Sequence, residues 1–269
     1  MEKIQNFLYK TIPGRIILKP LVQPPITKLG GLVLSTRLSA VYVNRFIKNN
    51  RIDMSDYEER KYSSFNDFFT RTILPGKRPL DTSPASLISP CDSALTVYDI
   101  NENSRFRIKS SVYTAAELIG ENADDCSGGK CLVFRLAVHN YHRYCFIDSG
   151  NIGKTKKIKG VFHTVMPISE EYKVFARNSR EVTVLHTDNF GDVCQIEVGA
   201  LMVGKISNRI INEKFSRGEE KGMFEFGGST IVLLLKKGAA EIRPDIIENS
   251  KKDIETPVKY GERIGVSAK

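Results

Sequence analysis

The chain of 269 residues contains no tryptophan, no Cys-x-x-Cys pair and no long apolar run. The missing tryptophan excludes nothing. The five cysteines are an odd number without paired spacing, so they predict free thiols in a reducing compartment. No stretch approaches the roughly 18 apolar residues of a membrane-spanning helix. The apolar stretch after Lys3 already ends at Lys10, so a secretory signal is not expected. The sequence therefore predicts a cytoplasmic protein without a spanning segment.

Three common nucleotide and hydrolase motifs are also missing. Neither the phosphate-binding P-loop pattern nor the glycine-rich dinucleotide fingerprint occurs. The nucleophile elbow Gly-x-Ser-x-Gly fails at Ser229, because Ile231 stands where the second glycine is required. These absences argue against an ATPase, a nicotinamide-dependent enzyme and an α/β-hydrolase.

Acidic residues are nearly absent from residues 1–51, which hold nine Lys or Arg and one acid, Glu2. This segment thus carries +8 of the formal net charge of +9. Its charges alternate with apolar residues, and the spacing over 31–49 predicts one amphipathic helix. Three interpretations remain open: a segment that lies on an anionic membrane, a nucleic-acid-binding segment, and a solvated basic cap on the core.

Beyond residue 88 the pattern changes to short β-type runs separated by Gly, Asn, Asp and Ser. A short helix is expected near 112–119. The fold class predicted is α+β, with a helical N-terminal segment followed by a mainly antiparallel β sandwich or partly closed barrel. We expect a membrane-associating segment at 1–55 and a catalytic domain at 56–269. The expected strands are Ala94–Ile100, Cys131–Val138, Tyr141–Ile147, Ile158–Val165, Glu181–Thr187, Val193–Val198 and Thr230–Leu235.

A serine, an aspartate and several histidines stand beside these expected strands. Ser229 precedes the apolar run Ile231–Leu235, Asp92 follows a Pro-Cys turn, and His142 and His163 lie in or near strands. Their meeting at one end of a sheet would give a nucleophile, a base and an orienting carboxylate. Taken singly, each residue is equally typical of a turn or of a hydrogen-bonded structural position.

A metal site is the rival hypothesis for the histidines. His139, His142 and Cys145 form a His-x-x-His-x-x-Cys pattern, and Cys131 lies nearby. On a strand, however, alternation sends such residues to opposite faces. We therefore expect no metal.

Five blocks of sequence, in order, resemble the phosphatidylserine decarboxylases, a family of self-processing enzymes with a pyruvoyl cofactor. They cover residues from about 60 to 235, whereas residues 1–51 match only in character. Each block alone is weak, but the ordered set is specific. The blocks are Phe65-Asn-Asp-Phe-Phe-Thr-Arg with Pro-Gly-Lys-Arg-Pro-Leu-Asp81, Ser89-Pro-Cys-Asp-Ser93, Tyr141-His-Arg143, Val198-Gly-Ala-Leu-Met-Val-Gly204 and Phe226-Gly-Gly-Ser-Thr230.

The resemblance implies that the chain cuts itself between Gly228 and Ser229. The products are a β chain of residues 1–228 and an α chain of residues 229–269, whose first residue becomes a covalent pyruvoyl group derived from Ser229. Only a residue with a β-oxygen can first attack the preceding carbonyl and then lose that oxygen by elimination. The pyruvoyl ketone then forms a Schiff base with the serine amine of the lipid and accepts electrons as CO2 leaves.

One position departs from the family pattern. Members of the family commonly carry, three residues after the Tyr-His-Arg histidine, a second histidine that serves as the base for self-cleavage; here that residue is Cys145. Asp92 matches the orienting carboxylate, and His142 matches the histidine linked to decarboxylation. We prefer His163, on the expected next strand, as the cleavage base, while His142 and Cys145 remain alternatives. His139 and His186 are interpreted as structural.

The function expected is decarboxylation of phosphatidylserine to phosphatidylethanolamine at the cytoplasmic face of the cell membrane, by a peripheral enzyme. The expected partners are the lipid, an anionic membrane surface and the two chains of one precursor; no nucleic acid is expected, and a homodimer is left open. Two alternatives remain: a pyruvoyl decarboxylase of a different amine-bearing acid, and a lipid-binding homologue that does not cleave itself.

Overall fold

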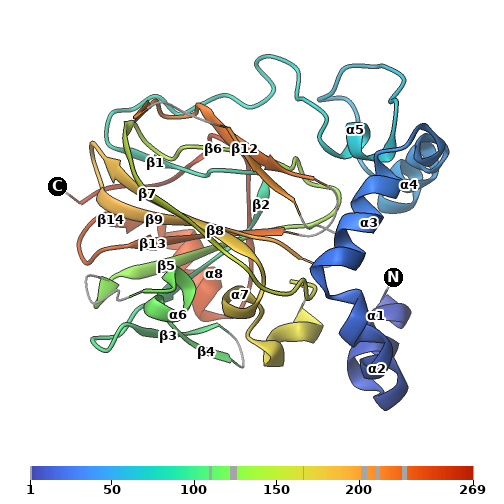
Figure 1. Cartoon of the computed structure of the whole chain (residues 1–269). Helices are drawn as coiled ribbons and strands as arrows, with labels where there is room; N and C mark the ends of the chain where they lie inside the picture. The colour runs from blue at the N-terminus through green and yellow to red at the C-terminus, as the bar shows by residue number, and fades with distance from the viewer. Residues whose placement is uncertain are drawn as a thin grey trace.

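The computed structural model describes residues 2–108, 111–121, 126–165, 167–200, 205–209, 213–225 and 229–268. Helices occupy the N-terminal part, and antiparallel sheets make up most of the remainder (Figure 1). The sheets do not close on themselves, so they form a sandwich rather than a barrel. The predicted α+β class is confirmed.

The N-terminal part folds as five short helices rather than as long ones. The expected continuous helix over 31–49 is wrong, because the chain turns at Ser35 and again changes helix type at Tyr42. The hydroxyl groups of Ser35, Thr36 and Ser39 donate to nearby carbonyl oxygens, which competes with helical hydrogen bonding. These elements are α1 (Glu2–Lys10), α2 (Ile12–Leu21), α3 (Pro24–Leu34), the 3₁₀ helix η1 (Arg37–Tyr42) and α4 (Val43–Asn50).

The inner sides of these helices pack against the rest of the molecule in two places. Near the N-terminus, Tyr9 and Leu18 are buried in a cluster against which Tyr172 packs. Further on, Val43 is buried with the phenylalanines of α5 (Phe65–Phe69). The helices therefore line one side of the sandwich, as Figure 1 shows.

The outer sides of the same helices are unusually apolar. Twelve of the fifteen exposed large apolar side chains that the structure describes lie between Ile4 and Tyr42. Leu38 and Val41, both on η1, are 82% and 74% exposed. In the part of the chain that is described, no helix has both the length and the apolarity to cross a bilayer.

An eight-stranded antiparallel sheet forms the centre of the sandwich. Its most buried strand, β13, consists of Ser and Thr followed by five aliphatic residues, and every position in it is buried. It lies between β9 and β5, so the strand has neighbours on both edges. The strand order is β11 (Lys214–Phe215), β7 (Gly150–Ile158), β8 (Arg180–Thr187), β9 (Gly191–Val198), β13 (Ser229–Leu235), β5 (Lys130–Leu136), β2 (Ser93–Asp99) and β15 (Thr256–Val258).

Smaller elements complete the sandwich. The sheet that carries the Tyr-His-Arg segment has the order β10 (Ile206–Asn208), β12 (Glu220–Phe224) and β6 (Arg143–Cys145). A third sheet has the order β1 (Ser86–Ile88), β16 (Arg263–Ser267) and β14 (Ala240–Ile242), and β3 (Arg105–Ile108) pairs with β4 (Ser111–Thr114). The remaining helices are α6 (Ala115–Ile119), η3 (Pro167–Tyr172), α7 (Val174–Arg177) and α8 (Pro244–Lys251).

One expected strand is wrong. The run 158–165 belongs to β7 only at Ile158, and Val161 makes a single isolated bridge to Asn178. The backbone of His163 instead bonds to the side chain of Asn178, whose Oδ1 accepts from His163 N and whose Nδ2 donates to His163 O. An asparagine side chain thus takes the place of a neighbouring strand.

Candidate active site

Ser229 is the first residue of β13 and is fully buried. β13 pairs with β5 along its whole length and with β9 from Thr230 onward. Among the residues that the structure describes, no group forms a hydrogen bond with the Ser229 Oγ. Gly228, and with it the expected cleavage bond, lies outside the described residues. The structure thus places a buried hydroxyl group at the point where the central strand begins.

Asp92 lies at the same end of the sheet, just before β2. Ala94 of β2 and Thr230 of β13 are both paired with Arg135 of β5, which lies between the two strands. The backbones near Asp92 and Ser229 are therefore two strand spacings, or roughly 10 Å, apart. The sequence prediction that these two residues share one end of a sheet is consistent with this register.

The Asp92 carboxylate is held by a guanidinium group and a backbone amide. Arg78 donates from Nε to Oδ1 over 2.9 Å and from Nη2 to Oδ2 over 2.6 Å. The backbone N–H of Tyr260 donates to Oδ1 over 2.8 Å. These two carboxylate interactions raise the pKa of Arg78, to which Asp56 contributes as well. Asp92 thus faces a permanent positive charge.

His142 is a fully buried histidine next to β12. Its carbonyl oxygen accepts from Phe224 N on β12, five residues before Ser229, and its ring packs 4.0 Å from the ring of Phe69. The ring atom Nδ1 lies 2.9 Å from the carbonyl oxygen of Asn140. A carbonyl only accepts, so Nδ1 carries the proton and, in the neutral ring, Nε2 carries the lone pair. That tautomer is the one a general base at Nε2 needs.

The His163 ring packs between aromatic side chains, Tyr9 of α1 and Tyr172 of η3. Its Nδ1 lies 3.3 Å from the Tyr9 hydroxyl, and its ring centre lies 4.7 Å from that of Tyr172. Burial lowers the pKa of His163 to about 4, and Arg177 contributes to this shift. The Asn178 side chain that bonds the His163 backbone also donates to Gly199 O, which directly follows β9, and Val198 of β9 pairs with Thr230 of β13. His163 therefore lies toward the same end of the sheet as Ser229, with its ring against Tyr9 and Tyr172.

Cys145, the residue at the family's second histidine position, is fully buried at the end of β6. Its Sγ faces the carbonyl oxygen of Ser89 at 3.9 Å, and its backbone N–H donates to Pro90 O. Burial raises the pKa of the Cys145 thiol to about 12. At neutral pH it is a protonated thiol, which is not a general base.

Among the described residues, neither of the other two histidines forms an ion pair or hydrogen bond with β13. His186 is on the β8–β9 hairpin at the far end of the sheet, where its Nδ1 lies 2.7 Å from Asp192. His139 is partly buried, and its carbonyl oxygen accepts from Arg71. Within the described residues, no three His, Cys, Asp or Glu side chains come together as metal ligands.

Three residues near Asp92 and His142 were not singled out from the sequence. Arg71 and Arg78 both lie in the first family-like block, so the motif contained the signal although their roles did not follow from it. Tyr260 had no signal, because it meets Asp92 across 168 residues of chain. Long-range contacts of this kind are not encoded in local spacing.

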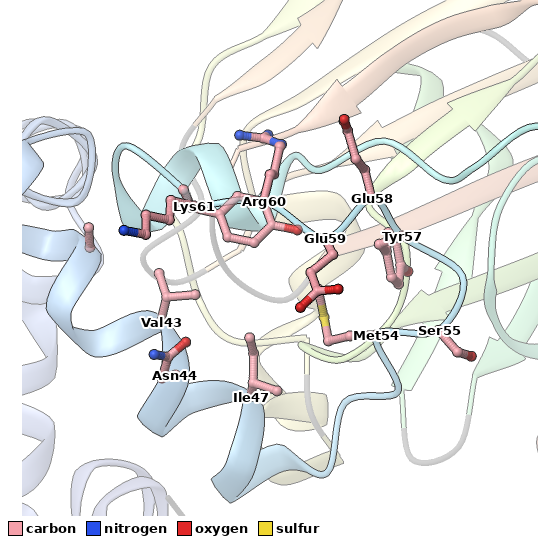
Figure 2. A pocket seen from close by; sticks show the side chains of 12 residues that line it. Val43, Asn44, Ile47, Met54, Ser55, Tyr57, Glu58, Glu59, Arg60 and Lys61 are labelled. Carbon is pink, nitrogen blue, oxygen red and sulfur yellow. The ribbon is translucent and has the colours of Figure 1, made fainter.

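A cavity of about 830 Å³ lies between α4 and the segment 54–62. Figure 2 shows Val43 and Ile47 projecting from α4 toward the segment that carries Met54 and Tyr57. Charged residues of 58–61 form part of its lining, so an apolar floor has a charged rim. The cavity is lined in part by Ala40 of η1, the helix that also carries the exposed Leu38 and Val41.

Comparison with known proteins gives one family. The sequence model described as phosphatidylserine decarboxylase matches residues 65–266. A protein named phosphatidylserine decarboxylase proenzyme 2, from Clostridium acetobutylicum, is 49% identical over 264 residues, which is 97% of this chain and 90% of the relative. Proteins named phosphatidylserine decarboxylase proenzyme are 41% identical in Ruminiclostridium cellulolyticum, over 98% of this chain and 91% of the relative, and 39% identical in Clostridium perfringens, over 98% and 92%.

Proposed function

Because the chain belongs to the phosphatidylserine decarboxylase family, whose members are lyases, we propose that it is a proenzyme that cuts itself between Gly228 and Ser229 and then converts phosphatidylserine into phosphatidylethanolamine and CO2. The observation that carries this proposal is the position of Ser229. Its hydroxyl is buried at the start of a strand that is bonded on both edges, at the same end of the sheet as Asp92.

Self-cleavage needs only the chain's own atoms and one water molecule. Ser229 Oγ attacks the Gly228 carbonyl carbon, and the peptide nitrogen leaves it, so the amide becomes an ester. Loss of the Ser229 α-proton then breaks the Cβ–Oγ bond and releases the Gly228 carboxylate. Addition of water and loss of ammonia convert the remaining dehydroalanine into a pyruvoyl group.

His142 is the residue we infer to accept the Ser229 hydroxyl proton. Its Nδ1 donates to Asn140 O, which fixes the tautomer whose Nε2 can take up a proton. Cys145 does not compete, because its raised pKa keeps the thiol protonated. The His163 ring lies against Tyr9 and Tyr172, and burial lowers its pKa to about 4, which together support a structural role. Asp92, whose strand β2 lies two strands from β13 at this end of the sheet, is the carboxylate that we infer to favour the imidazolium formed at His142.

The described residues fit a pyruvoyl group at position 229. After the cut, β13 remains bonded to β5 and β9, so the new N-terminus stays at the same buried place. The group supplies an electrophilic carbonyl that binds the substrate amine and accepts the electron pair left when CO2 departs. Ser229 and Thr230 are both fully buried, so the chain shields this position from bulk solvent.

The lipid substrate requires that the enzyme reach a bilayer surface, and the N-terminal helices are suited to this. They combine twelve exposed large apolar side chains with +8 of the formal charge. Such a surface inserts its apolar side chains at the interface and attracts anionic lipids through its basic ones. We place residues 1–55 on the cytoplasmic face of the membrane, as a peripheral segment attached to a catalytic domain of residues 56–269.

The test is decarboxylation in detergent micelles that contain phosphatidylserine. We expect the wild-type protein to run as two bands on a denaturing gel and to release CO2, whereas Ser229→Ala should remain one chain and release none. Wild-type protein that remains one chain and is inactive would support a lipid-binding homologue. A cut protein that decarboxylates a soluble amine-bearing acid but not the lipid would support the other alternative.

A further inference from the structure

Arg71 is a buried cation that has no carboxylate partner among the residues that the structure describes. It follows α5 by two residues and is 2% exposed. Its guanidinium carbon lies 4.3 Å from the ring centre of Tyr57 and 4.6 Å from that of Phe68. None of the ion pairs among the described residues involves Arg71. A buried ion without a counter-ion costs several kcal/mol, so this position is not explained by stability.

The hydrogen bonds of Arg71 are long, and its donors are not all used. Its terminal nitrogens approach Phe68 O at 3.3 Å, His139 O at 3.3 Å and the Tyr57 hydroxyl at 3.4 Å. Its Nε is buried and has no hydrogen-bond partner within the described residues. The guanidinium group is therefore held in place mainly by two aromatic rings, with donor capacity to spare.

Arg180 shows what a structural buried arginine looks like in the same molecule. It is also buried, and it also lacks a carboxylate partner among the described residues. Its Nε donates to Leu118 O over 2.7 Å, and its Nη2 donates to Glu117 O over 2.7 Å. Its Nη1 donates to two further carbonyl oxygens. All three nitrogens of Arg180 are thus satisfied, whereas those of Arg71 are not.

The location of Arg71 connects the cavity with the candidate active site. Tyr57, which stacks on the guanidinium group, also lines the cavity of Figure 2. On the other side, Arg71 donates to His139 O in the loop that leads to His142. Phe69, two residues before Arg71, packs on the His142 ring. A ligand anion at Arg71 would therefore lie between this cavity and the reacting residues.

We propose that Arg71 binds the phosphodiester group of the substrate lipid and so sets the distance between the lipid head group and position 229. This rests on the proposed function. A planar guanidinium group suits two phosphate oxygens at once. The substrate carboxylate is the poorer candidate: its charge disappears as CO2 leaves, so a cation on it would stabilise the ground state more than the transition state. The phosphodiester charge is the same throughout the reaction.

Access to Arg71 requires that a covering side chain moves, because the residue is almost fully buried. We name Tyr57 as this side chain, since it contacts the guanidinium group and also lines the cavity, with Tyr141 as a further ring neighbour. Lipid that enters from the cavity would replace this ring contact with charge-assisted hydrogen bonds, which are the stronger interaction.

The experiment compares Arg71→Gln and Arg71→Lys with the wild type, using a water-soluble short-chain phosphatidylserine. We expect both variants to cut themselves, and Arg71→Gln to lose about 10- to 100-fold in kcat/KM, mainly through KM. Arg71→Lys should lose less, since it keeps the charge but not the fork. Arg180→Lys is the matched control, and its KM should stay at the wild-type value.

A binding measurement on uncut protein separates this proposal from the proposed function. In the Ser229→Ala background, glycerophosphoethanolamine should raise the unfolding temperature more than ethanolamine does, and Arg71→Gln should abolish the difference. Failure of wild-type self-cleavage would leave this measurement intact. The proposal is overturned if Arg71→Lys has the wild-type KM and the wild-type phosphate-dependent stabilisation, while Arg71→Gln is either unfolded or unchanged. That result would show that Arg71 has only a structural role.

Discussion

Arg78 and Asp92 form a two-point ion pair at the end of the central sheet, with Nη2 2.6 Å from Oδ2 and Nε 2.9 Å from Oδ1. Their side chains are only 11% and 9% exposed. Asp92 also accepts from Tyr260 N, which belongs to the expected α chain, whereas Arg78 belongs to the expected β chain. The carboxylate thus joins two segments that are expected to belong to different products of self-cleavage.

Arg78→Gln should therefore slow self-cleavage by about tenfold or more. It leaves a buried carboxylate without its cation, which is strongly unfavourable and displaces the charge that Asp92 provides. In the Asp92→Asn background, the same change should have little further effect, because the two residues act as one unit. The rate at which the precursor band disappears on a denaturing gel measures both.

The matched control for Arg78 is Arg217→Gln. Arg217 Nη2 lies 2.5 Å from Oδ1 of Asp148, which is fully buried near the β8–β9 turn, at the opposite end of the sheet. Removing this guanidinium group should lower the unfolding temperature but leave the cleavage rate of folded protein unchanged. Slow cleavage in both variants would mean that Arg78 matters only for stability.

Cys145→Ala should cut at nearly the wild-type rate. The pKa of the thiol is raised to about 12 by burial, so no thiolate is present between pH 6 and pH 9. The pH dependence of the cleavage rate across this range should accordingly be the same in the wild type and in Cys145→Ala. A precursor that accumulates in Cys145→Ala but not in Cys145→Ser would return the thiol position to the mechanism.

His142→Gln should accumulate uncut precursor, whereas His163→Gln should still cut. The reason is that Nδ1 of His142 donates to Asn140 O, which leaves Nε2 as the basic atom, whereas the His163 ring is enclosed by Tyr9 and Tyr172 and burial lowers its pKa to about 4. Time courses of both variants on one gel decide between the two histidines. Normal cutting by His142→Gln together with a block in His163→Gln would reverse the assignment.

His163 also makes a prediction about pH and stability. The folded pKa is lowered from 6.5 to about 4, so between these values the unfolded chain binds a proton that the folded chain does not. The free energy of unfolding should therefore fall as pH decreases from about 6.5 toward 4. His163→Gln should flatten this decline, measured as unfolding temperature against pH. Identical slopes in both proteins would contradict the buried, neutral state of the ring.

The apolar surface of η1 should be needed on liposomes but not for self-cleavage. Leu38→Ser with Val41→Ser removes two of the most exposed apolar side chains, each able to contribute about 1.5 kcal/mol or more when buried in lipid. Activity on anionic liposomes should fall by about tenfold, and activity in detergent much less. Val112→Ser with Ile254→Ser, which are exposed elsewhere, is the control.

Charge makes a parallel contribution that salt should reveal. Changing Arg37, Arg45 and Lys48 together to Gln should weaken flotation with anionic liposomes, because each basic residue near the surface adds about 1 kcal/mol. Wild-type binding should also weaken at 1 M salt, where the Debye length is about 3 Å. Liposome binding that is unchanged by salt and equal for neutral and anionic lipids would indicate that the basic segment is only a solvated cap.

The central strands were predictable because each contains buried β-branched or aliphatic residues. The predicted ranges for β13, β5, β8 and β9 are confirmed within a few residues, and each of these strands has neighbours on both edges. β7 was not predicted, since its exposed lysines and Gly153 give no alternation. The run containing His163 looked like a strand, but Asn178 satisfies its backbone instead.

The site was predictable only where chemistry leaves a local pattern. Ser229 is recognisable because a hydroxyl next to glycines precedes a buried strand, and Asp92 because it lies in a family-like block. The partners of Asp92 depend on contacts across 14 and 168 residues. The burial of Arg71 between two rings likewise appears only once the chain is folded.

The measurement that tests the account most directly is the intact mass of the purified wild-type protein under denaturing conditions. Self-cleavage at Ser229 predicts two chains: residues 1–228 with a free carboxylate, and residues 229–269 lighter by one ammonia than their sequence requires, because the serine has become a pyruvoyl group. A single chain of 269 residues from protein that decarboxylates phosphatidylserine, or a second chain that begins with unmodified Ser229, would contradict the account.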